Sequence, residues 1–314
     1  MPQVSVVIPV HRGGPFARDA VRSATTQSLD DLEVLVVSDG CTEDLTDLER
    51  MDGRVQVLNR DHAGVSIARN SGVAASLGEY VAFLDEDDRS RPERLQSQFD
   101  ALRDSPSAGM CHGGFQVMNV DGVVEGPRLG KELDYPAMLA CQFPLLSSMM
   151  VRRSVFWEVG GFDPALVTGE DVDLALRIAM QRDVVFVPEV LTYYRVHDSN
   201  TTNTVSELWD TYPLIQRHRR WAEHAGRSDL VEAADSGLHE IRHNASNFAF
   251  HNARDARRRG NLPEAARQMA LSFLRDPRQA SSQVWSAAFH SSGTSAVDWM
   301  TRGCRNAKAK GIAR

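Results

Sequence analysis

Short apolar runs alternate with amphipathic segments along the first part of the chain. The runs are rich in β-branched side chains and mostly lack a polar alternation, which is typical of strands buried on both faces of a parallel sheet. The predicted strands are residues 4–10, 32–37, 55–58 and 80–84, and the predicted helices are residues 16–27, 44–51 and 64–76. This order predicts an α/β protein with a Rossmann-like, mostly parallel sheet and helices on both faces.

The alternation continues less regularly from residue 92 to about residue 200. Pro92 begins a helix, since proline is favoured in a first turn. The further predicted elements are the rest of this helix to residue 103, extended segments at 108–124, 147–151, 184–188 and 191–196, and helices at 155–159 and 170–179. We expect residues 1–204 to form one α/β domain.

The composition changes after about residue 204. Strand signals nearly vanish, and residues that favour helix, such as alanine, arginine, glutamate and leucine, dominate. Gly260 and Asn261 predict a tight turn between two helices, with the glycine as a C-cap and the asparagine as an N-cap. We expect residues 205–314 to form an all-helical region, of which the last 20 or so residues are a mobile end.

Composition and charge are those of an ordinary folded protein. Of its 314 residues 42% are hydrophobic and 25% charged, and the formal charge of −7 offers no general electrostatic basis for binding nucleic acid. Cys41, Cys111, Cys141 and Cys304 have no paired spacing, as expected of reduced thiols. The sequence shows no leader pattern and no apolar window of the roughly 20 residues that cross a bilayer. We expect a cytoplasmic protein, with peripheral membrane association left open.

Four consecutive acids, Asp85 to Asp88, follow the predicted strand at 80–84. Neighbouring carboxylates repel one another, so a folded protein either exposes them to water or neutralises them with a cation. The carboxyl end of a parallel strand is also where open α/β sheets bind their ligands. The run is therefore either a divalent-metal and sugar-diphosphate site or a solvated loop, and taken alone it favours the loop.

Seven short motifs follow one another along the chain. They are residues 4–10, 37–42, 68–72, 83–88 with Pro92, 160–163, 169–174 and 194–197. In this order they resemble the inverting family 2 glycosyltransferases, which have a GT-A fold and use nucleotide-sugar donors. The resemblance covers about residues 3–200 and leaves the helical tail outside it. It implies a mixed, mostly parallel sheet of the GT-A type.

The resemblance also implies a nucleotide pocket beyond the first two strands. Asp39 matches the family aspartate that recognises the base, whereas an Asp-Gly pair by itself favours a turn. Arg69 matches the arginine that reaches the nucleotide or its phosphates, and its alternative is a solvated helix residue. Pro9 and His11 belong to the pocket wall by resemblance alone.

By the same resemblance the acid run is the family's DxD element, which binds Mn²⁺ or Mg²⁺. Such hard cations prefer oxygen ligands and bridge a diphosphate to protein carboxylates. The resemblance makes Asp87 the direct metal ligand and places Asp85 at the ribose or a metal-bound water. His197 matches a histidine that contacts the metal or the diphosphate, although a lone histidine is more often structural. Glu86 is expected to point to the other side of the chain.

Glu170 and Asp171 begin a predicted helix, where acids also serve as caps and complement the helix dipole. The resemblance makes Asp171, with Glu170 beside it, the catalytic site, and Asp171 the base that takes the proton from an acceptor hydroxyl. No carboxylate then acts as a covalent nucleophile, so the transfer inverts the anomeric centre. Gly161 and Phe162 are expected to line the donor sugar, with a core position as the alternative for Phe162.

These expectations describe a metal-dependent inverting glycosyltransferase. It moves a hexosyl or N-acetylhexosaminyl group from a nucleotide diphosphate sugar, first of all a UDP-sugar, to a small molecule, a lipid-linked glycan or a peptide. The C-terminal helices either complete the acceptor cleft or form a homodimer interface, and no nucleic acid is expected as a partner. Two alternatives stay open. One is a nucleotide-sugar-binding scaffold without catalysis. The other is a sugar nucleotidyltransferase, which would have a Gly-rich, basic loop after the first strand, and residues 11–14 match such a loop only weakly.

Overall fold

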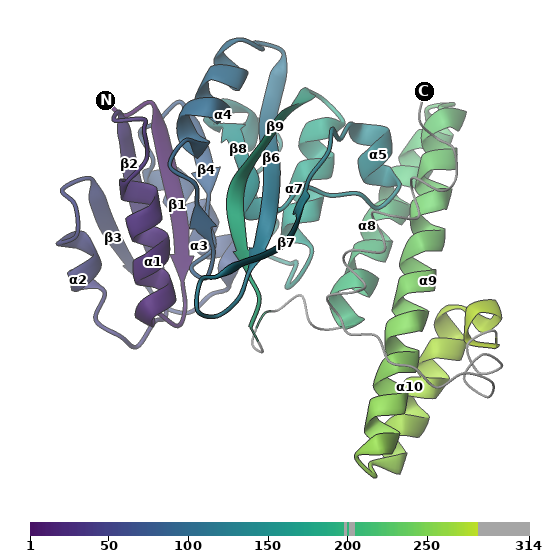
Figure 1. Ribbon diagram of the computed structural model, residues 1–314. Coiled ribbons are helices and arrows are strands. Elements are labelled where there is room, and N and C mark those ends of the chain that lie inside the picture. Colours follow the sequence, from purple (N-terminus) through teal and green to yellow (C-terminus); the bar gives the residue numbers. More distant parts are fainter. Residues whose placement is uncertain (198–199, 201–204, 282–314) are drawn as a thin grey trace. The chain divides into compact units, whose positions relative to one another are not determined.

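The computed structural model describes residues 1–197, 200 and 205–281 (Figure 1). The described residues form two compact units that divide between residues 242 and 243, inside the long helix α9 (Ser228–Arg258). The domain boundary that we expect after residue 204 stays a prediction. The expected mobile end lies outside the described residues.

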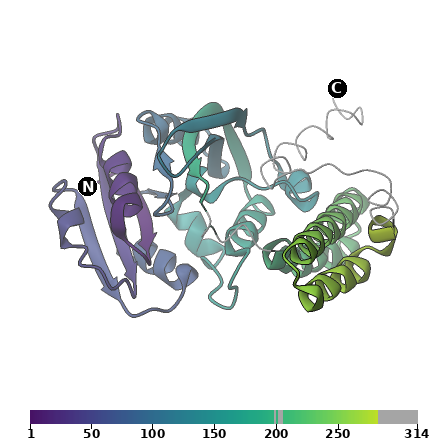
Figure 2. The same ribbon diagram turned by 60° about the horizontal axis from the view of Figure 1, so that its bottom comes forward.

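The first half of the sheet is parallel, as predicted. Its strands are β1 (Val4–Val10), β2 (Leu32–Asp39), β3 (Val55–Arg60) and β4 (Tyr80–Phe83), in the spatial order β3-β2-β1-β4. Val4 of β1 lies opposite Leu32 of β2 and Tyr80 of β4, so these three strands start level with one another. Because they run in one direction, their carboxyl ends meet at one edge of the sheet, which comes forward in Figure 2.

The second half of the sheet is mixed. Its strands are β5 (Arg89–Ser90), β6 (Ala108–Met118), β7 (Val124–Leu129), β8 (Met149–Arg152) and β9 (Asp183–Arg195). β8 lies antiparallel between β4 and β6, while β9 runs parallel to β6. Among the described residues the strand order is β3-β2-β1-β4-β8-β6-β9-β5, with β7 beside β6. The predicted mixed, mostly parallel sheet is confirmed.

The two strands expected within residues 184–196 are one strand, β9. Val187 lies opposite Gly113 and Val190 opposite Gly114, so the proline and glutamate between the two valines sit in a bulge. A bulge tolerates proline because the extra residues leave the hydrogen-bonded ladder. The proline therefore interrupts the pairing of this strand and does not end it.

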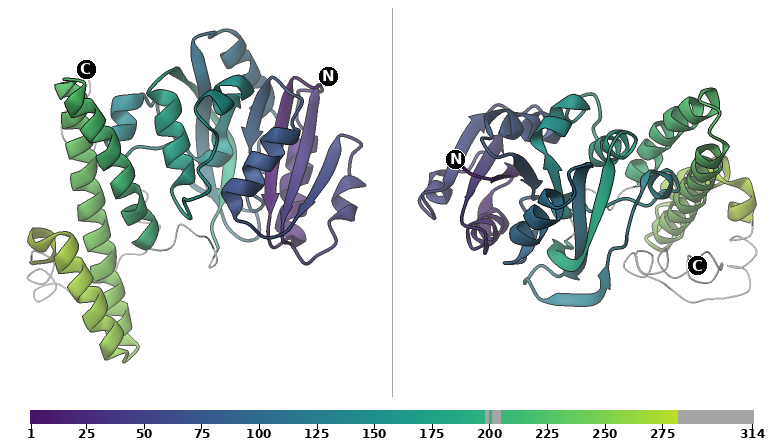
Figure 3. Two further views of the ribbon diagram at one scale, coloured as in Figure 1. Left: turned by 180° about the vertical axis from the view of Figure 1, so that it is seen from behind. Right: turned by 90° about the horizontal axis from the view of Figure 1, so that it is seen from above.

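Helices cover both faces of the sheet, as predicted. Val6 and Ile8 of β1 pack into one hydrophobic core and Val7 packs into the other, because successive side chains of a strand point to opposite faces. The first core is covered by α1 (Gly14–Thr25), α2 (Thr46–Glu49) and α4 (Arg94–Arg103). The second is covered by α3 (Val65–Ala75), α5 (Tyr135–Leu139), the 3₁₀ helix η1 (Leu146–Ser148), α6 (Arg153–Glu158) and α7 (Glu170–Ala179). In Figure 1 α1 lies in front of the sheet, and in the view from behind in Figure 3 α3 does.

The helical character predicted after residue 204 is confirmed for the described residues 205–281. Leu214 of α8 (Val205–His224) and Ile241 of α9 are buried in the same hydrophobic core as α7. In the second unit the end of α9 and α10 (Leu262–Arg275) form a hairpin, within which the Oγ atoms of Ser246 and Ser272 lie 3.0 Å apart. Of the helices that the structure describes, each is too short or too polar to cross a bilayer.

The turn of this hairpin has the chemistry that the sequence predicts. Gly260 has a φ of 75°, a conformation that favours glycine at the end of a helix. The side-chain oxygen of Asn261 accepts a hydrogen bond from the backbone N–H of Glu264 at 3.2 Å, which makes Asn261 the N-cap of α10.

Candidate active site

Arg69 joins the two acidic segments that the sequence singles out. It lies on α3 with 4% of its surface exposed, and its guanidinium donates to Asp85 and to Glu170, each at 2.6 Å. Burial alone lowers the pKa of Arg69, but the two carboxylates more than offset this and raise it above its ordinary value. The alternative of a solvated helix residue is therefore wrong. Through Arg69, the end of β4 and the start of α7 form one site.

The four acids after β4 do not form a solvated loop. Asp88 is fully buried and accepts a hydrogen bond from the backbone N–H of Arg195 at 2.9 Å. The carboxylate of Glu86 accepts from three successive backbone N–H groups, those of residues 11–13, at 3.0 to 3.2 Å. Glu86 therefore links the loop after β1 to the acid run. The expectation that its side chain points to the other side of the chain did not include this contact.

Asp87 and His197 meet although 110 residues separate them in the chain. The Nε2 atom of His197 lies 2.9 Å from Oδ2 of Asp87. The ring of Phe16 stacks on His197 at 5.4 Å between centroids, and the guanidinium of Arg195 lies over the same phenyl ring at 4.5 Å. Arg195 also donates to the backbone oxygen of Asp87 at 2.8 Å. Packing of Phe16 thus holds His197, and the hydrogen bond from Arg195 holds the backbone of Asp87.

The acid run is crowded with negative charge. Burial, and then the charge of Asp85, raise the pKa of Asp87, and burial with the charges of Asp87 and Asp85 raises that of Asp88 well above its ordinary value. At this end of the run Asp87 and His197 bring a carboxylate oxygen and an imidazole nitrogen to 2.9 Å from each other, and both kinds of atom can bind a divalent cation such as Mn²⁺.

Asp171, the second residue of α7, stands beside Glu170 in a different setting. Burial, and then the charge of Glu170, raise its pKa to about 6, against the opposing influence of Arg69. Glu170 forms an ion pair with Arg69 at 2.6 Å. A carboxylate whose pKa lies near neutrality is suited to general base catalysis.

Asp39 ends β2 and organises the start of α3. Its Oδ1 atom accepts hydrogen bonds from the backbone N–H groups of Ala63 at 2.7 Å and of Gly64 at 3.2 Å. The ring of His62 approaches Oδ2 of Asp39 at 3.0 Å, and that of His11 approaches the backbone oxygen of Asp39 at 2.9 Å. The sequence assigns no role to His62, because its partner Asp39 is 23 residues away.

The ring of Phe162 lies in the core, which is the alternative position expected for it. Phe162 is 1% exposed and packs edge-on against Phe83 at 5.1 Å between centroids. Its backbone is held at both ends, because Asn70 donates to the oxygen of Phe162 at 2.8 Å and accepts from its nitrogen at 2.9 Å. Arg177 donates to the oxygen of Gly161 at 2.7 Å. The loop is thus clamped by two polar side chains, Asn70 of the motif at residues 68–72 and Arg177, for neither of which the sequence predicts this contact.

Pro9 is buried within β1, opposite Val37 of β2.

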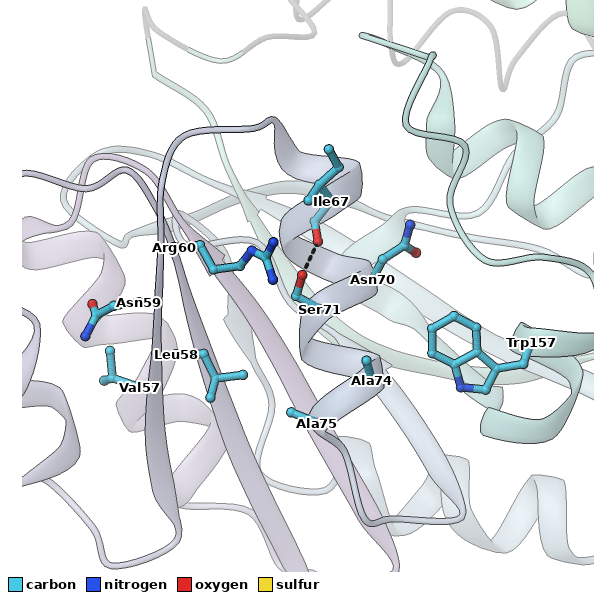
Figure 4. Close-up of a pocket in the computed structure, with 10 residues that line it drawn as sticks. All are labelled: Val57, Leu58, Asn59, Arg60, Ile67, Asn70, Ser71, Ala74, Ala75 and Trp157. Carbon is cyan, nitrogen blue, oxygen red and sulfur yellow. Dashed lines mark hydrogen bonds between the residues drawn. The ribbon is translucent and has the colours of Figure 1, made fainter.

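A groove of about 770 Å³ lies apart from the acid run, between β3, α3 and Trp157 of α6 (Figure 4). Arg60 and Asn70 line this groove, and Trp157 is 46% exposed beside them. Of the described residues that line it none is acidic, so the groove is chemically separate from the cluster around Arg69.

The mixed, mostly parallel sheet, with acidic and histidine side chains at its carboxyl edge, has the architecture of the GT-A class. The family model of glycosyl transferase family 2 matches residues 5–160. The chain belongs to this family, as the seven motifs indicated. An uncharacterized glycosyltransferase of Rickettsia typhi is 29% identical over 228 residues, which cover 68% of this chain and 70% of that protein.

Solved structures share the fold. S. aureus TarS matches with a TM-score of 0.61 and 16% identity over 88% of this chain and 54% of the TarS chain. TarS 1–349 in complex with UDP-GlcNAc matches with a TM-score of 0.58 and 13% identity over 88% of this chain and 92% of that one. A mannosyltransferase from Pyrobaculum calidifontis in complex with GDP-Man and Mn²⁺ matches with a TM-score of 0.55 and 16% identity, over 91% of this chain and 79% of the other.

Proposed function

We propose that this chain is a metal-dependent inverting glycosyltransferase that uses a UDP-sugar as donor. The observation that carries the proposal is the double ion pair of Arg69, which joins Asp85 after β4 to Glu170 at the start of α7. A donor-binding acid run and a catalytic carboxylate belong to one reaction only if they share one site. The hydrogen bonds of Arg69 to Asp85 and to Glu170 support a single site for both segments.

At the donor end, Asp39 and His11 bind the base, and Asp85 faces the ribose or the diphosphate. The carboxylate of Asp39 is already oriented by two backbone N–H groups, so it needs little reorganisation to accept a hydrogen bond from a base. A uracil ring N–H suits this acceptor, and the complexes of the structural neighbours with UDP-GlcNAc and GDP-Man keep GDP-sugars as the second donor class to test.

Asp87 and His197 are the residues that would hold the metal ion, with Asp85 beside them. The shared donor set of carboxylate oxygens and one imidazole suits Mn²⁺ better than Mg²⁺, which prefers oxygen alone. A bound divalent cation supplies charge compensation to a diphosphate leaving group. The raised pKa values of Asp87 and Asp88, caused first by burial, support a site that is completed by positive charge.

Asp171 is the proposed base. It accepts the proton of the acceptor hydroxyl as that oxygen attacks the anomeric carbon, and the nucleotide diphosphate leaves from the opposite face. Glu170 is held by Arg69 at 2.6 Å and is therefore a poor nucleophile, which supports a single displacement with inversion. The transferred group is a hexosyl or N-acetylhexosaminyl unit, and the acceptor is a small molecule, a lipid-linked glycan or a peptide. The C-terminal helices serve the acceptor or a homodimer.

The test is a donor panel. The purified full chain is incubated with UDP-, GDP- and dTDP-sugars with Mn²⁺, with Mg²⁺ or with a chelator, and both thermal stabilisation and donor hydrolysis are measured. We expect stabilisation and slow hydrolysis with a UDP-sugar and Mn²⁺, and loss of hydrolysis but not of stabilisation in Asp171→Asn. No response to any nucleotide or nucleotide sugar would overturn the proposal, and equal stabilisation without hydrolysis in both proteins would favour a binding protein.

A further inference from the structure

A second cluster of metal-ligating side chains lies at the same edge of the sheet as the acid run. His11 follows β1, Asp39 ends β2 and His62 precedes α3. One ligand atom from each residue, a ring nitrogen or a carboxylate oxygen, lies within 4.8 Å of the other two. The two imidazole rings are 4.8 Å apart between centroids. Three donors from three separate segments therefore converge on one small volume.

We propose that His11, Asp39 and His62 bind a transition-metal ion of the Zn²⁺ or Co²⁺ type, at a site distinct from the one at Asp87. Two imidazole nitrogens and one carboxylate oxygen are a donor set that Zn²⁺ and Co²⁺ bind more tightly than Mn²⁺ or Mg²⁺ do. The acid run offers mainly oxygen and suits the harder ions. The two sites thus differ in the metal that they select.

The carboxylate of this site is oriented before any ion arrives. The backbone N–H groups of Ala63 and Gly64 hold Oδ1 of Asp39, while its Oδ2 faces Nδ1 of His62 at 3.0 Å. The side chain of Asp39 is 7% exposed and that of His62 is 64% exposed. An outer shell of hydrogen bonds that orients a ligand strengthens metal binding. The site therefore has a fixed, buried base and an open side through which an ion can enter.

Gly40 lets His62 come this close. It has a φ of 69°, and a Cβ atom at this position would lie 2.6 Å from Cβ of His62. Any larger residue would push the imidazole away from Asp39 and strain the backbone. Gly40→Ala should thus weaken metal binding although it removes no ligand.

The site also predicts competition with the donor. If Asp39 and His11 bind the nucleotide base, as the proposed function holds, an ion on the same side chains excludes the base. Zn²⁺ should then inhibit by competing with the nucleotide sugar, in contrast to a stimulating ion at Asp87. This consequence rests on the proposed function, whereas the metal site itself does not.

The test uses Co²⁺ alone, added to the full chain without nucleotide and followed by visible absorption and calorimetry. We expect one Co²⁺ with ligand-field bands, and a loss of affinity of about tenfold or more in His62→Gln, His11→Gln and Gly40→Ala. His224→Gln, which alters an exposed histidine of α8, is the matched control and should bind as the wild type does. Asp87→Asn should also keep the site. Circular dichroism shows that each variant is folded.

Three results would overturn the proposal: no Co²⁺ bands in the wild type, the same affinity in both folded histidine variants, or loss of the bands in Asp87→Asn alone. The addition of uridine, which has the base but no diphosphate that could chelate Co²⁺, separates this proposal from the preceding one. Displacement of Co²⁺ by uridine supports both. Co²⁺ that depends on His62 but is not displaced by uridine keeps the metal site and removes Asp39 from base recognition.

Discussion

Glu170 and Asp171 are neighbours in sequence, yet their surroundings give them different chemistry. Arg69 neutralises Glu170 through a hydrogen bond of 2.6 Å, whereas burial and the charge of Glu170 raise the pKa of Asp171 to about 6. A buried carboxyl group whose pKa lies near neutrality can take up and release a proton at ordinary pH. The pair therefore has one structural member and one member that is suited to move a proton.

A pH profile tests this assignment. The proposed base is active only when ionised, so kcat/KM should be constant above pH 6 and fall about tenfold per pH unit as the pH drops below the pKa of Asp171, which is about 6. Asp171→Asn should lower kcat by roughly 10²–10⁴-fold and remove this dependence. A profile with the same acid limb in the variant would contradict the role of Asp171.

Phe16 is a positioning residue for the metal site. Its ring contacts both the imidazole of His197 and the guanidinium of Arg195, so Phe16→Leu should leave His197 less well oriented toward Asp87. We expect a loss of about tenfold in Mn²⁺ affinity, measured by electron paramagnetic resonance titration. Phe99→Leu, on α4 and also with a ring contact, is the control. Equal Mn²⁺ affinity in the two variants would show that Phe16 only packs.

At the scale of elements, α3 connects the parts of the site. It carries Arg69, which pairs with the acids after β4 and at the start of α7, and Asn70, which clamps the backbone of Phe162. Asp39 holds the start of the helix. The position of α3 against β1 and β2 therefore sets the geometry of three site segments at once.

Gly72 of α3 sets how closely this helix approaches the sheet. A Cβ atom there would lie 2.5 Å from a methyl carbon of Val7 and 3.1 Å from one of Val37, in a core that has no room to relax. Gly72→Ala should lower the free energy of unfolding by about 1–3 kcal/mol in urea titrations and should reduce donor affinity. Gly53→Ala meets open space and is the matched control. A Gly72→Ala protein as stable as this control would show that α3 is free to shift.

At the scale of the whole molecule, buried neutral histidines link folding to pH. His112 of β6 is fully buried, and neither ring nitrogen has a hydrogen-bond partner among the described residues. Burial lowers the pKa of His112, and likewise that of His218, to about 4. The folded state therefore resists a proton that the unfolded chain accepts below about pH 6.5. Above pH 6.5 both states keep each histidine neutral, and the free energy of unfolding does not depend on its protonation. As the pH falls from 6.5 toward 4, only the unfolded chain binds the proton, so the free energy of unfolding decreases.

His112→Met isolates this contribution. Between pH 7 and pH 5 the wild type should lose roughly 2 kcal/mol more free energy of unfolding than the variant does. Carboxylates with raised pKa values, such as Asp171, act in the opposite direction in both proteins, so the difference between the two is the informative quantity. His224→Gln, on the surface of α8, should keep the wild-type dependence. The same pH dependence in His112→Met would show that His112 is protonated without cost.

Much of the fold is predictable because its signals are local. The strands β1 to β4, the helices between them and the turn at Gly260 and Asn261 follow from the periodicity and capping preferences of short segments. Where an element is as short as β5, or where a bulge interrupts β9, local patterns do not suffice. Pairing with a neighbouring strand then decides the structure.

The sequence by itself determined the parallel strands, the acid run at a strand end and, through its motifs, the family. The tertiary structure decided which of these residues meet. It paired Arg69 with Glu170 across 101 positions and Asp87 with His197 across 110, brought His62 to Asp39, and turned Phe162 into the core. The physical reason is that strand propensity, helix periodicity and capping act over a few residues, whereas ion pairing and burial depend on distances that exist only once the sheet and α3 have packed.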